Sequence, residues 1–474
     1  MSKSKILLFS SISFILGIAF SEFLAVPFFI VYTIFILTVV TLFLKNKKRF
    51  LLFFLLFFLA GILRFDFSRP KEINVEEKII FNGIIIEEVE DRNDYQNLVV
   101  QDEIGRRALV RVNSYPKYFF GESLKINCKP KAIDLESSYG RYLTKNKINY
   151  ICYYPKIEVL SSVSGNTVYS QILKFKQNGK EIINKNVPSP EAEILGAMLL
   201  GYKKEIPQEW RGRFSIAGIS HIVAISGMHL VIISIILMIG LIRVGLWRQQ
   251  AFYATIIFLW LYITMIAYPA SAVRAGIMIS LVLWAQHLGR ARNVISVIFF
   301  AAAILLLVNP LFLLSDIGFQ LSFLAVLGII YLTPIFSFWF RKVPDFWDLK
   351  KILLVTLSAQ IVTLPLSVYY FEIIPLLALP INLIIIPLLP IIFILGMLII
   401  FTGFFWSSVS IFIGYLVWAI LNIVLKIVLA ISSLKFSSFQ VEEINLFWIF
   451  GVYAILIFAV YKIKKKQDFE IMME

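Results

Sequence analysis

The chain has 474 residues, of which 59% are hydrophobic and 16% are charged, and its mean hydropathy is +0.82. Soluble domains usually contain about 45–50% apolar and about 25% charged residues, so this composition excludes an ordinary soluble protein. The formal net charge is +15, which leaves binding to a nucleic acid open. Residues 71–158 are nevertheless neutral, with 14 basic and 14 acidic side chains, and the positive excess lies in short loops and the C-terminal tail. That distribution is typical of the positive-inside rule and favours membrane orientation over DNA binding as its cause.

Apolar runs of the length that crosses a bilayer, about 20 residues, predict about twelve membrane helices. Three of them open the chain, and the first two are interpreted as retained helices because they lack a convincing cleavage site for a signal peptidase. With the basic loops inside, both termini are cytoplasmic and the segment after the third helix is extracytoplasmic. The predicted helices cover residues 5–21, 23–44, 50–66, 219–242, 250–268, 271–288, 293–308, 314–338, 352–371, 374–401, 405–431 and 444–461.

Between the third and fourth predicted helices the pattern changes to short segments with strand-like alternation and turn residues between them. Ala108, Val110 and Val112 share one face, while Arg107 and Arg111 share the other. About five such strands are typical of a small Greek-key barrel of the OB type, although their spacing fits other small β-domains too. The predicted strands cover residues 78–90, 97–102, 106–113, 122–128 and 149–160.

The two cysteines of the chain, Cys128 and Cys152, both fall in this β segment. Two thiols in one extracytoplasmic domain favour a disulfide, because that compartment is oxidising. The alternative is a pair of small buried hydrophobic side chains.

Residues 167–217 are apolar but too charged to cross a bilayer, and they predict amphipathic helices on the outer membrane surface. If the protein binds DNA, we expect the basic side chains of this region to contact the phosphates. These candidates are Lys174, Lys176, Lys180, Lys203, Lys204, Arg211 and Arg213. The chain is thus predicted to be an α-helical polytopic membrane protein with an inserted, small extracytoplasmic OB-like β-barrel. Its predicted parts are N-terminal helices (1–67), a β domain (68–166), interfacial helices (167–217), a channel domain (218–461) and a basic tail (462–474).

Polar side chains inside membrane segments are costly, so each needs a partner or a water-filled cavity. In residues 218–230, Ser226 and His229 are three positions apart on one helical face, close to His221 and Gly227. A Ser–His pair suggests nucleophilic catalysis, but no acidic residue lies at helical spacing to orient the histidine. The other reading is that these residues line a pore or pack between helices.

Further polar residues lie in the later predicted helices. Asp316 and Gln320 share a helical face, and Arg274 either snorkels to the membrane surface or enters the helix bundle. An Arg274–Asp316 pair would neutralise the acid. Five prolines lie between positions 365 and 390; Gln360 comes just before this stretch, and Asn382 lies within it. Because prolines break helices, and broken helices are tolerated at membrane depth where they line a cavity, this stretch predicts a translocation path.

These segments resemble the ComEC family of bacterial DNA-uptake channels. Residues 218–230 are similar to its Gly-x-x-His-Leu-(x)-Ala-Ile-Ser-Gly-x-His signature, and residues 271–276, 316–322 and 360–382 are similar to its later blocks. Residues 139–150 resemble the end of its OB-like domain, and residues 191–201 resemble the helix before the signature. The resemblance implies a plasma-membrane channel that takes up single-stranded DNA during natural transformation. Its path would be lined by His221, Ser226, Gly227, His229, Arg274, Asp316, Gln320, Gln360 and Asn382.

Many members of that family also carry a C-terminal metallo-β-lactamase-like domain. This sequence has three histidines, none of them in a His-x-His-x-Asp-His arrangement, so we expect no nuclease activity, metal site or cofactor in it. The resemblance implies single-stranded DNA and membrane lipid as partners, and with them an outer DNA receptor, a separate nuclease and a cytoplasmic motor ATPase. The alternatives are a transporter of another polyanion or metabolite on the same scaffold, and an intramembrane hydrolase using Ser226 and His229.

Overall fold

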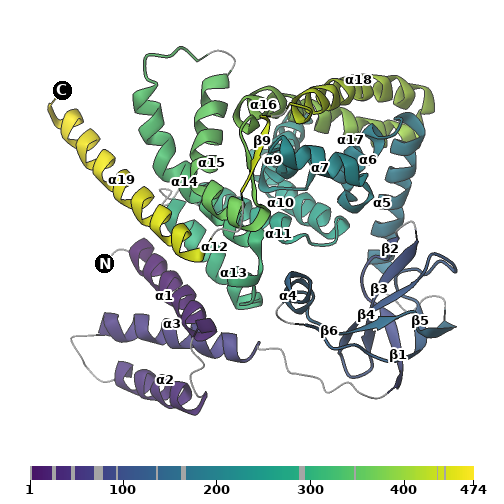
Figure 1. Cartoon of the computed structure of the whole chain (residues 1–474), viewed down its shortest axis with the longest axis horizontal. Helices are drawn as coiled ribbons and strands as arrows, with labels where there is room; N and C mark the ends of the chain where they lie inside the picture. The colour runs from purple at the N-terminus through teal and green to yellow at the C-terminus, as the bar shows by residue number, and fades with distance from the viewer. Residues whose placement is uncertain are drawn as a thin grey trace. The chain divides into compact units, whose positions relative to one another are not determined.

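A computed structural model describes eleven stretches of the chain, namely residues 3–23, 28–43, 49–68, 78–91, 94–134, 137–161, 167–287, 294–345, 348–434, 436–441 and 445–473. The chain divides into two compact units. The first unit comprises Met1–Lys176 and Trp247–Asp316, and the second comprises Gln177–Leu246 and Ile317–Glu474. Figure 1 shows the elements of both in chain order.

Helices α1 and α3 of the first unit pack closely because two glycines leave room for the neighbouring backbone. A Cβ atom added at Gly17 would lie 2.0 Å from the carbonyl oxygen of Phe58, and one at Gly61 would lie 2.3 Å from that of Phe14. Small residues of this kind are the usual means by which membrane helices approach each other. The helices of this unit are α1 (Lys3–Phe23), α2 (Phe28–Phe43), α3 (Arg49–Asp66), α10 (Arg248–Met265), α11 (Ala270–His287), α12 (Val294–Val308) and α13 (Phe312–Ser315), with α4 (Ser138–Lys145) in the β domain.

The predicted β segment forms one sheet of seven strands, which we call the β domain. The strand order is β6-β4-β3-β1-β5-β7, with β2 paired to β3, and the β4–β6 pair is parallel while the others are antiparallel. The alternation predicted around Val110 is confirmed, since Ala108, Val110 and Val112 are buried. The strands are β1 (Ile79–Ile85), β2 (Glu90–Asp91), β3 (Tyr95–Asp102), β4 (Arg107–Asn113), β5 (Ser123–Cys128), β6 (Ile148–Tyr153) and β7 (Lys156–Ser161).

The described strands do not close into the predicted barrel, because no ladder joins β5 to β6. Only an isolated bridge between Lys131 and Ile151 crosses this seam, with backbone N···O distances of 2.8 and 3.1 Å. β5 instead pairs with the additional strand β7. A strand offers hydrogen-bonding groups along two edges only, so a β5 that is paired to β1 and β7 has no edge left for a β6 ladder.

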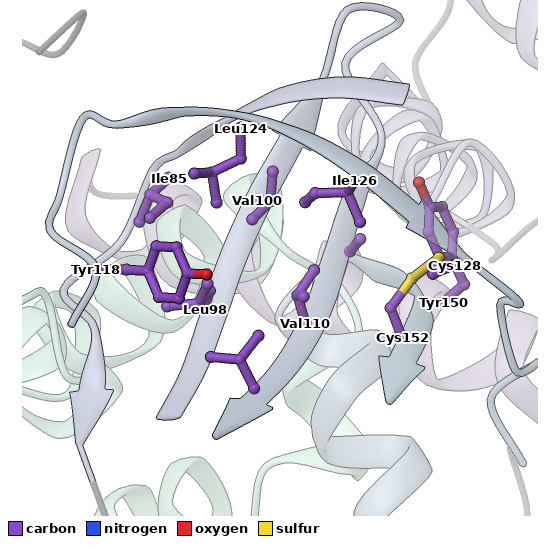
Figure 2. Close-up of a cluster of buried hydrophobic side chains, with 12 residues drawn as sticks. Ile85, Leu98, Val100, Val110, Tyr118, Leu124, Ile126, Cys128, Tyr150 and Cys152 are labelled. Carbon is purple, nitrogen blue, oxygen red and sulfur yellow. A yellow bond between two sulfur atoms is a disulfide. The ribbon is translucent and has the colours of Figure 1, made fainter. Parts of the chain in front are cut away.

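A disulfide between Cys128 of β5 and Cys152 of β6 joins the two sides of the seam, and the disulfide prediction is confirmed. Figure 2 shows it at one end of the sheet core, beside the ring of Tyr150. Burial raises the pKa of the Tyr150 hydroxyl to about 12, because the charged form is disfavoured away from water.

In the second unit, the predicted helix 219–242 is broken into two and the predicted helix 374–401 into three, while the proline at position 365 lies inside a continuous α15. Within the predicted interfacial region 167–217, residues 191–216 form three short elements, of which α6 is buried along most of its length. The helices are α5 (Thr167–Asn186), α6 (Glu191–Leu200), η1 (Lys203–Glu205), α7 (Gln208–Ile216), α8 (Ser220–Val223), α9 (Gly227–Arg243), α14 (Ile317–Trp339), α15 (Leu349–Phe371), α16 (Ala378–Ile385), η2 (Ile386–Leu388), α17 (Leu389–Phe405), α18 (Ser407–Ser432) and α19 (Leu446–Met473). Strand β8 (Ile373–Pro375) pairs with β9 (Ser438–Gln440).

Six helical segments among the described residues are long and apolar enough to cross a membrane. Three further apolar helices are shorter, at 10–17 residues. The predicted count of twelve spans is therefore not confirmed, although a helix is present at each of the twelve predicted places. Several of the other helices are described over fewer than the roughly 20 residues that span a bilayer. The six spans are Ser4–Ser21, Ile317–Trp339, Leu349–Phe371, Ala378–Phe405, Ser407–Ser432 and Phe447–Lys465.

The disulfide gives a direct chemical prediction. We expect maleimide labelling of the denatured, unreduced protein to modify no cysteine and labelling after reduction to modify both, because Cys128 and Cys152 are bonded. Reduction should also destabilise the β domain by roughly 3 kcal/mol, because the bond closes a loop between residues 24 positions apart and so restricts the unfolded chain. Labelling of both thiols without reductant would contradict the pairing, and a Cys128→Ala/Cys152→Ala variant separates loss of the bond from the effect of the reductant.

Candidate functional site

The segment 218–230 forms a broken helix in the second unit. Helix α8 ends at Val223, Ala224 has an extended backbone (φ −85°, ψ 137°), and α9 begins at Gly227. Ser226 is the N-terminal cap of α9. The structure therefore interrupts this helix where the sequence places its serine, its glycine and one of its histidines.

Gly218 brings the segment 218–230 against the proline-rich segment of the same unit. Its φ of +73° is a left-handed conformation that favours glycine. An added Cβ atom would lie 2.5 Å from the Cβ atom of Ala378 and 2.9 Å from that of Pro375. Two stretches that are more than 150 residues apart in the sequence thus meet, at the turn between α7 and α8 in one and at the start of α16 in the other.

Ser226 and His229 contact each other as predicted, but in an arrangement that caps a helix. The Ser226 backbone N–H donates to His229 Nδ1 at 2.8 Å, and Ser226 Oγ lies 3.0 Å from the same nitrogen. An imidazole nitrogen has one lone pair, and here the backbone N–H uses it, so Nδ1 is poorly placed to remove a proton from the hydroxyl. The geometry disfavours the hydrolase hypothesis.

Three polar side chains of residues 218–230, those of His221, Ser226 and His229, differ in their exposure to solvent. His229 is fully buried, with its ring centroid 4.9 Å from that of Phe393 in α17, whereas His221 on α8 is exposed. Ser226 is half-buried between them in the chain. The segment thus presents one polar group to the bundle interior and one to its surface.

Asn382 is the buried polar residue of the proline-rich segment. Its side chain, in the short helix α16, is 4% exposed, and its Oδ1 atom has no hydrogen-bond partner among the described residues. A buried, unsatisfied polar atom costs about 1–3 kcal/mol. An amide at this place is consistent with contact to water or to a polar ligand.

The two predicted glutamines lie on the neighbouring helices α14 and α15. The Tyr370 hydroxyl of α15 donates to Gln320 Oε1 of α14 at 3.2 Å, so Gln320 joins the two helices. Gln360 lies half-buried on α15, ten residues before Tyr370. The structure does not bring Gln320 and Gln360 into contact with each other.

Asp316 lies in the first unit with two cationic partners. The carboxylate is 5% exposed, and its Oδ2 atom lies 2.9 Å from Lys145 Nζ and 3.7 Å from Arg274 Nη1. Arg274 is also buried, at 4% exposure. Arg274 therefore enters the packed interior of the protein rather than extending to its surface, and it lies near the acid that the sequence suggested.

Lys145 is a further candidate residue of this cluster, and sequence reasoning did not indicate it. It ends α4 of the β domain, and its carbonyl oxygen accepts a hydrogen bond from Asn309 Nδ2 at 2.9 Å. Its ammonium group also lies 5.7 Å from the centre of the Phe312 ring. Figure 1 shows α4 beside α13. No local pattern could have indicated this pair, because Lys145 and Asp316 are 171 positions apart.

The seven predicted basic residues divide into two groups. Lys176 is 3% exposed and lies 2.5 Å from Glu88, while Lys180 and Arg213 each lie 2.6 Å from a carboxylate, of Glu205 and Glu209 respectively. These three charges are neutralised by partners and are less suited to phosphate binding than predicted. The exposed members of the set are Lys174, Lys203, Lys204 and Arg211.

Among the described residues, no group of three His, Cys, Asp or Glu side chains is arranged to hold a metal ion. The candidate residues are therefore polar side chains at helix breaks in the second unit and, separately, a buried charge cluster in the first unit. Among the described residues of either, nothing resembles a nucleophile with its base and orienting acid.

Substitutions in the cluster of Asp316, Lys145 and Arg274 should differ in their effect on the stability of the protein. We expect Asp316→Asn to destabilise the full chain by about 3–5 kcal/mol, because it leaves two buried cations without their acid. Lys145→Met should cost less, since Arg274 stays close to the carboxylate. Thermal unfolding in detergent, as a double-mutant cycle with the combined variant, measures the coupling.

The matched control for this cycle is Lys125→Met, which removes the exposed ion pair of Lys125 with Glu158. Exposed pairs contribute about 0–1 kcal/mol, so little change is expected there. If the Asp316→Asn variant kept wild-type stability and expression, the two buried cations would not need the acid, and the prediction would be wrong.

Comparison with known proteins places this arrangement in a family. The model of the family described as "Competence protein" matches residues 198–466, which include the broken helix, the glutamines and the proline-rich segment. The chain is also 28% identical over 255 residues to "ComE operon protein 3" of Bacillus subtilis (strain 168). That match covers 52% of this chain and 31% of the Bacillus protein, so the chain spans about a third of the relative's length.

No solved structure matches the chain. The family match extends over more than half of the sequence and includes the residues that form the broken helices. The chain therefore belongs to the competence protein family, the ComEC family that its motifs resemble.

Proposed function

We propose that the chain forms a membrane channel that takes up single-stranded DNA across the bacterial plasma membrane during natural transformation. Membership of the competence protein family supports this function, as does the similarity to the protein named "ComE operon protein 3". The composition and the six long apolar helices support a location in the membrane. In this proposal both termini are cytoplasmic and the β domain is extracytoplasmic, in agreement with the distribution of basic residues.

The observation that carries the proposal is the contact between two broken helical segments at Gly218. Irregular backbone at membrane depth is tolerated where it is buried in protein or lines a cavity. The two segments supply polar groups there, including the unsatisfied Oδ1 atom of Asn382. Together with the resemblance, these groups support a path along the second unit past His221, Ser226, Gly227, His229, Gln320, Gln360 and Asn382.

The charge of the cluster around Asp316 also suits a polyanionic substrate. A channel for DNA should not present an unpaired acid to the strand, because like charges repel. Asp316 faces both Lys145 and Arg274, so these three ionised groups together carry one positive charge. A cluster of this sign attracts phosphates rather than repelling them.

The β domain and the exposed basic residues would receive the strand outside the membrane. The parallel β4–β6 pair and the helix α4 between β5 and β6 are compatible with an OB-like arrangement that is incompletely closed. Lys174, Lys203, Lys204 and Arg211 are the exposed members of the predicted basic set. An outer DNA receptor, a separate nuclease and a cytoplasmic motor ATPase are the partners that this function requires.

Transformation of the native host tests the proposal. A deletion strain should lose transformation while it still binds DNA at its surface, and the wild-type gene should restore it. His229→Ala and Gln320→Ala should each lower DNA uptake by about tenfold or more at normal protein level, because a change of 1.4 kcal/mol in a barrier is tenfold in rate. Uptake of labelled DNA into a nuclease-protected state is the measurement.

Ser234→Ala is the matched control, because this buried hydroxyl lies on the same helix as His229 and bonds to the Val231 carbonyl. Its uptake should remain at the wild-type level. Normal transformation in the deletion strain would instead favour the transport of another polyanion or metabolite, and wild-type uptake in both alanine variants would remove these residues from the path.

A further inference from the structure

A cluster of four tyrosines and one arginine lies on the β domain, on the face of the sheet opposite the core that Figure 2 shows. We call it the tyrosine cluster. Three members come from adjacent strands and two from α4, which packs on that face of the sheet. Its members are Tyr95 of β3, Arg111 of β4, Tyr153 of β6, and Tyr139 and Tyr142 of α4.

Arg111 is held between two aromatic rings. Its Cζ atom lies 4.3 Å from the centre of the Tyr95 ring and 5.4 Å from that of Tyr153. β4 runs between β3 and β6, so the two rings flank the guanidinium from both sides. Its Nε atom donates to Asn97 Oδ1 at 3.3 Å, and within the described residues no carboxylate lies at ion-pair distance from it. Within the part of the chain that the structure describes, Arg111 thus presents a cation in a fixed position with no ion-pair partner.

The tyrosines of α4 provide flat rings that face solvent. The rings of Tyr139 and Tyr142 are nearly parallel, at 18°, with centroids 6.3 Å apart. Tyr139, Tyr142 and Tyr153 are 47%, 45% and 42% exposed. Burial raises the pKa of Tyr139, and the charge of Arg111 opposes that rise, so the two parts of the cluster lie within electrostatic range.

Exposed parallel rings next to a fixed cation have the chemistry of a binding surface for single strands. Bases stack on aromatic side chains without regard to sequence, while a cation binds the backbone phosphate. Tyrosine supplies such contact area at low cost in conformational entropy, because it has only two side-chain torsions. A duplex fits less well, because its bases are already stacked on one another.

We propose that the tyrosine cluster is a base-stacking platform that binds single-stranded DNA. This inference rests on the function proposed above and names the site at which the β domain contacts the strand. A membrane surface is the other ligand that tyrosines favour. The polar neighbours Asn97 and Glu90 argue against it, because lipid-facing tyrosines lie on apolar surfaces.

The test compares two oligonucleotides on the full chain in lipid nanodiscs. One is an oligothymidylate of about 12 nucleotides, and the other has the same length and phosphates but no bases. We expect the wild type to bind the thymidylate at least about tenfold more tightly, which corresponds to the stacking of one or two bases. A Tyr139→Ala/Tyr142→Ala variant should lose this preference and keep its affinity for the abasic strand, whereas Tyr139→Phe/Tyr142→Phe should retain both.

Phe119→Ala is the matched control, since Phe119 is an exposed aromatic residue (60%) of the same domain outside the cluster. It should bind both strands as the wild type does. Complete formation of the Cys128–Cys152 bond in each variant shows that β5 and β6 still come together when the β domain folds. The proposal is overturned if the wild type binds both strands equally, or if the double alanine variant keeps its preference.

A nitroxide label distinguishes DNA from lipid as the ligand. Because both native cysteines are bonded, Tyr142→Cys provides a single reactive thiol. The label should be accessible to water-soluble relaxants and become immobilised when the oligothymidylate binds. Accessibility to oxygen dissolved in the lipid would assign the cluster to the membrane surface and overturn the proposal. Each of these outcomes would overturn the tyrosine-cluster proposal alone. The proposed uptake function is contradicted by a different result, normal transformation of the deletion strain.

Discussion

The first unit depends on the neutralisation of one buried carboxylate. Asp316 is 5% exposed, and an ion removed from water in this way is stable only with close partners and good geometry. Its partners come from two places in the chain, Lys145 at the end of α4 and Arg274 within α11. The same carboxylate therefore links the β domain to the helices that follow it in the first unit. Asn309 adds to this link by donating to the last carbonyl group of α4.

The second unit depends on a different constraint, the need to satisfy the backbone hydrogen-bonding groups where helices are interrupted. At the start of α9 the Ser226 N–H donates to the His229 ring, so a side chain replaces the hydrogen bond that the helix cannot supply. Gly218 lets the two broken segments approach each other, since a larger residue would contact Pro375 and Ala378. The polar ring of His229, the small residue Gly218 and the proline-rich segment are therefore parts of one arrangement within the second unit.

The β domain of the first unit depends on how its open seam is held together. Its strand ladder is open between β5 and β6, and the Cys128–Cys152 bond joins the two strands there. The segment that contains helix α4 connects β5 to β6, the two strands on either side of this seam. Its C-terminal residue Lys145 binds Asp316, while its first turns carry the two stacked tyrosines. One short helix thus bears both the attachment to the helices that follow the β domain in the first unit and the surface that we propose for the strand.

The sequence by itself determined the membrane class, the position of each apolar helix and the β segment, because hydropathy and alternation are local properties of the chain. It also determined the cysteine pair, since the chain has only two, and the family, since the motif around Ser226 and His229 is continuous in sequence. Tertiary structure decided what depends on distant partners. The choice of Lys145 as the closest partner of Asp316, the burial of Lys176 against Glu88 and the open seam of the sheet all join residues far apart in the chain. Such pairings follow from packing and from the limited number of strand edges, which no local pattern of residues encodes.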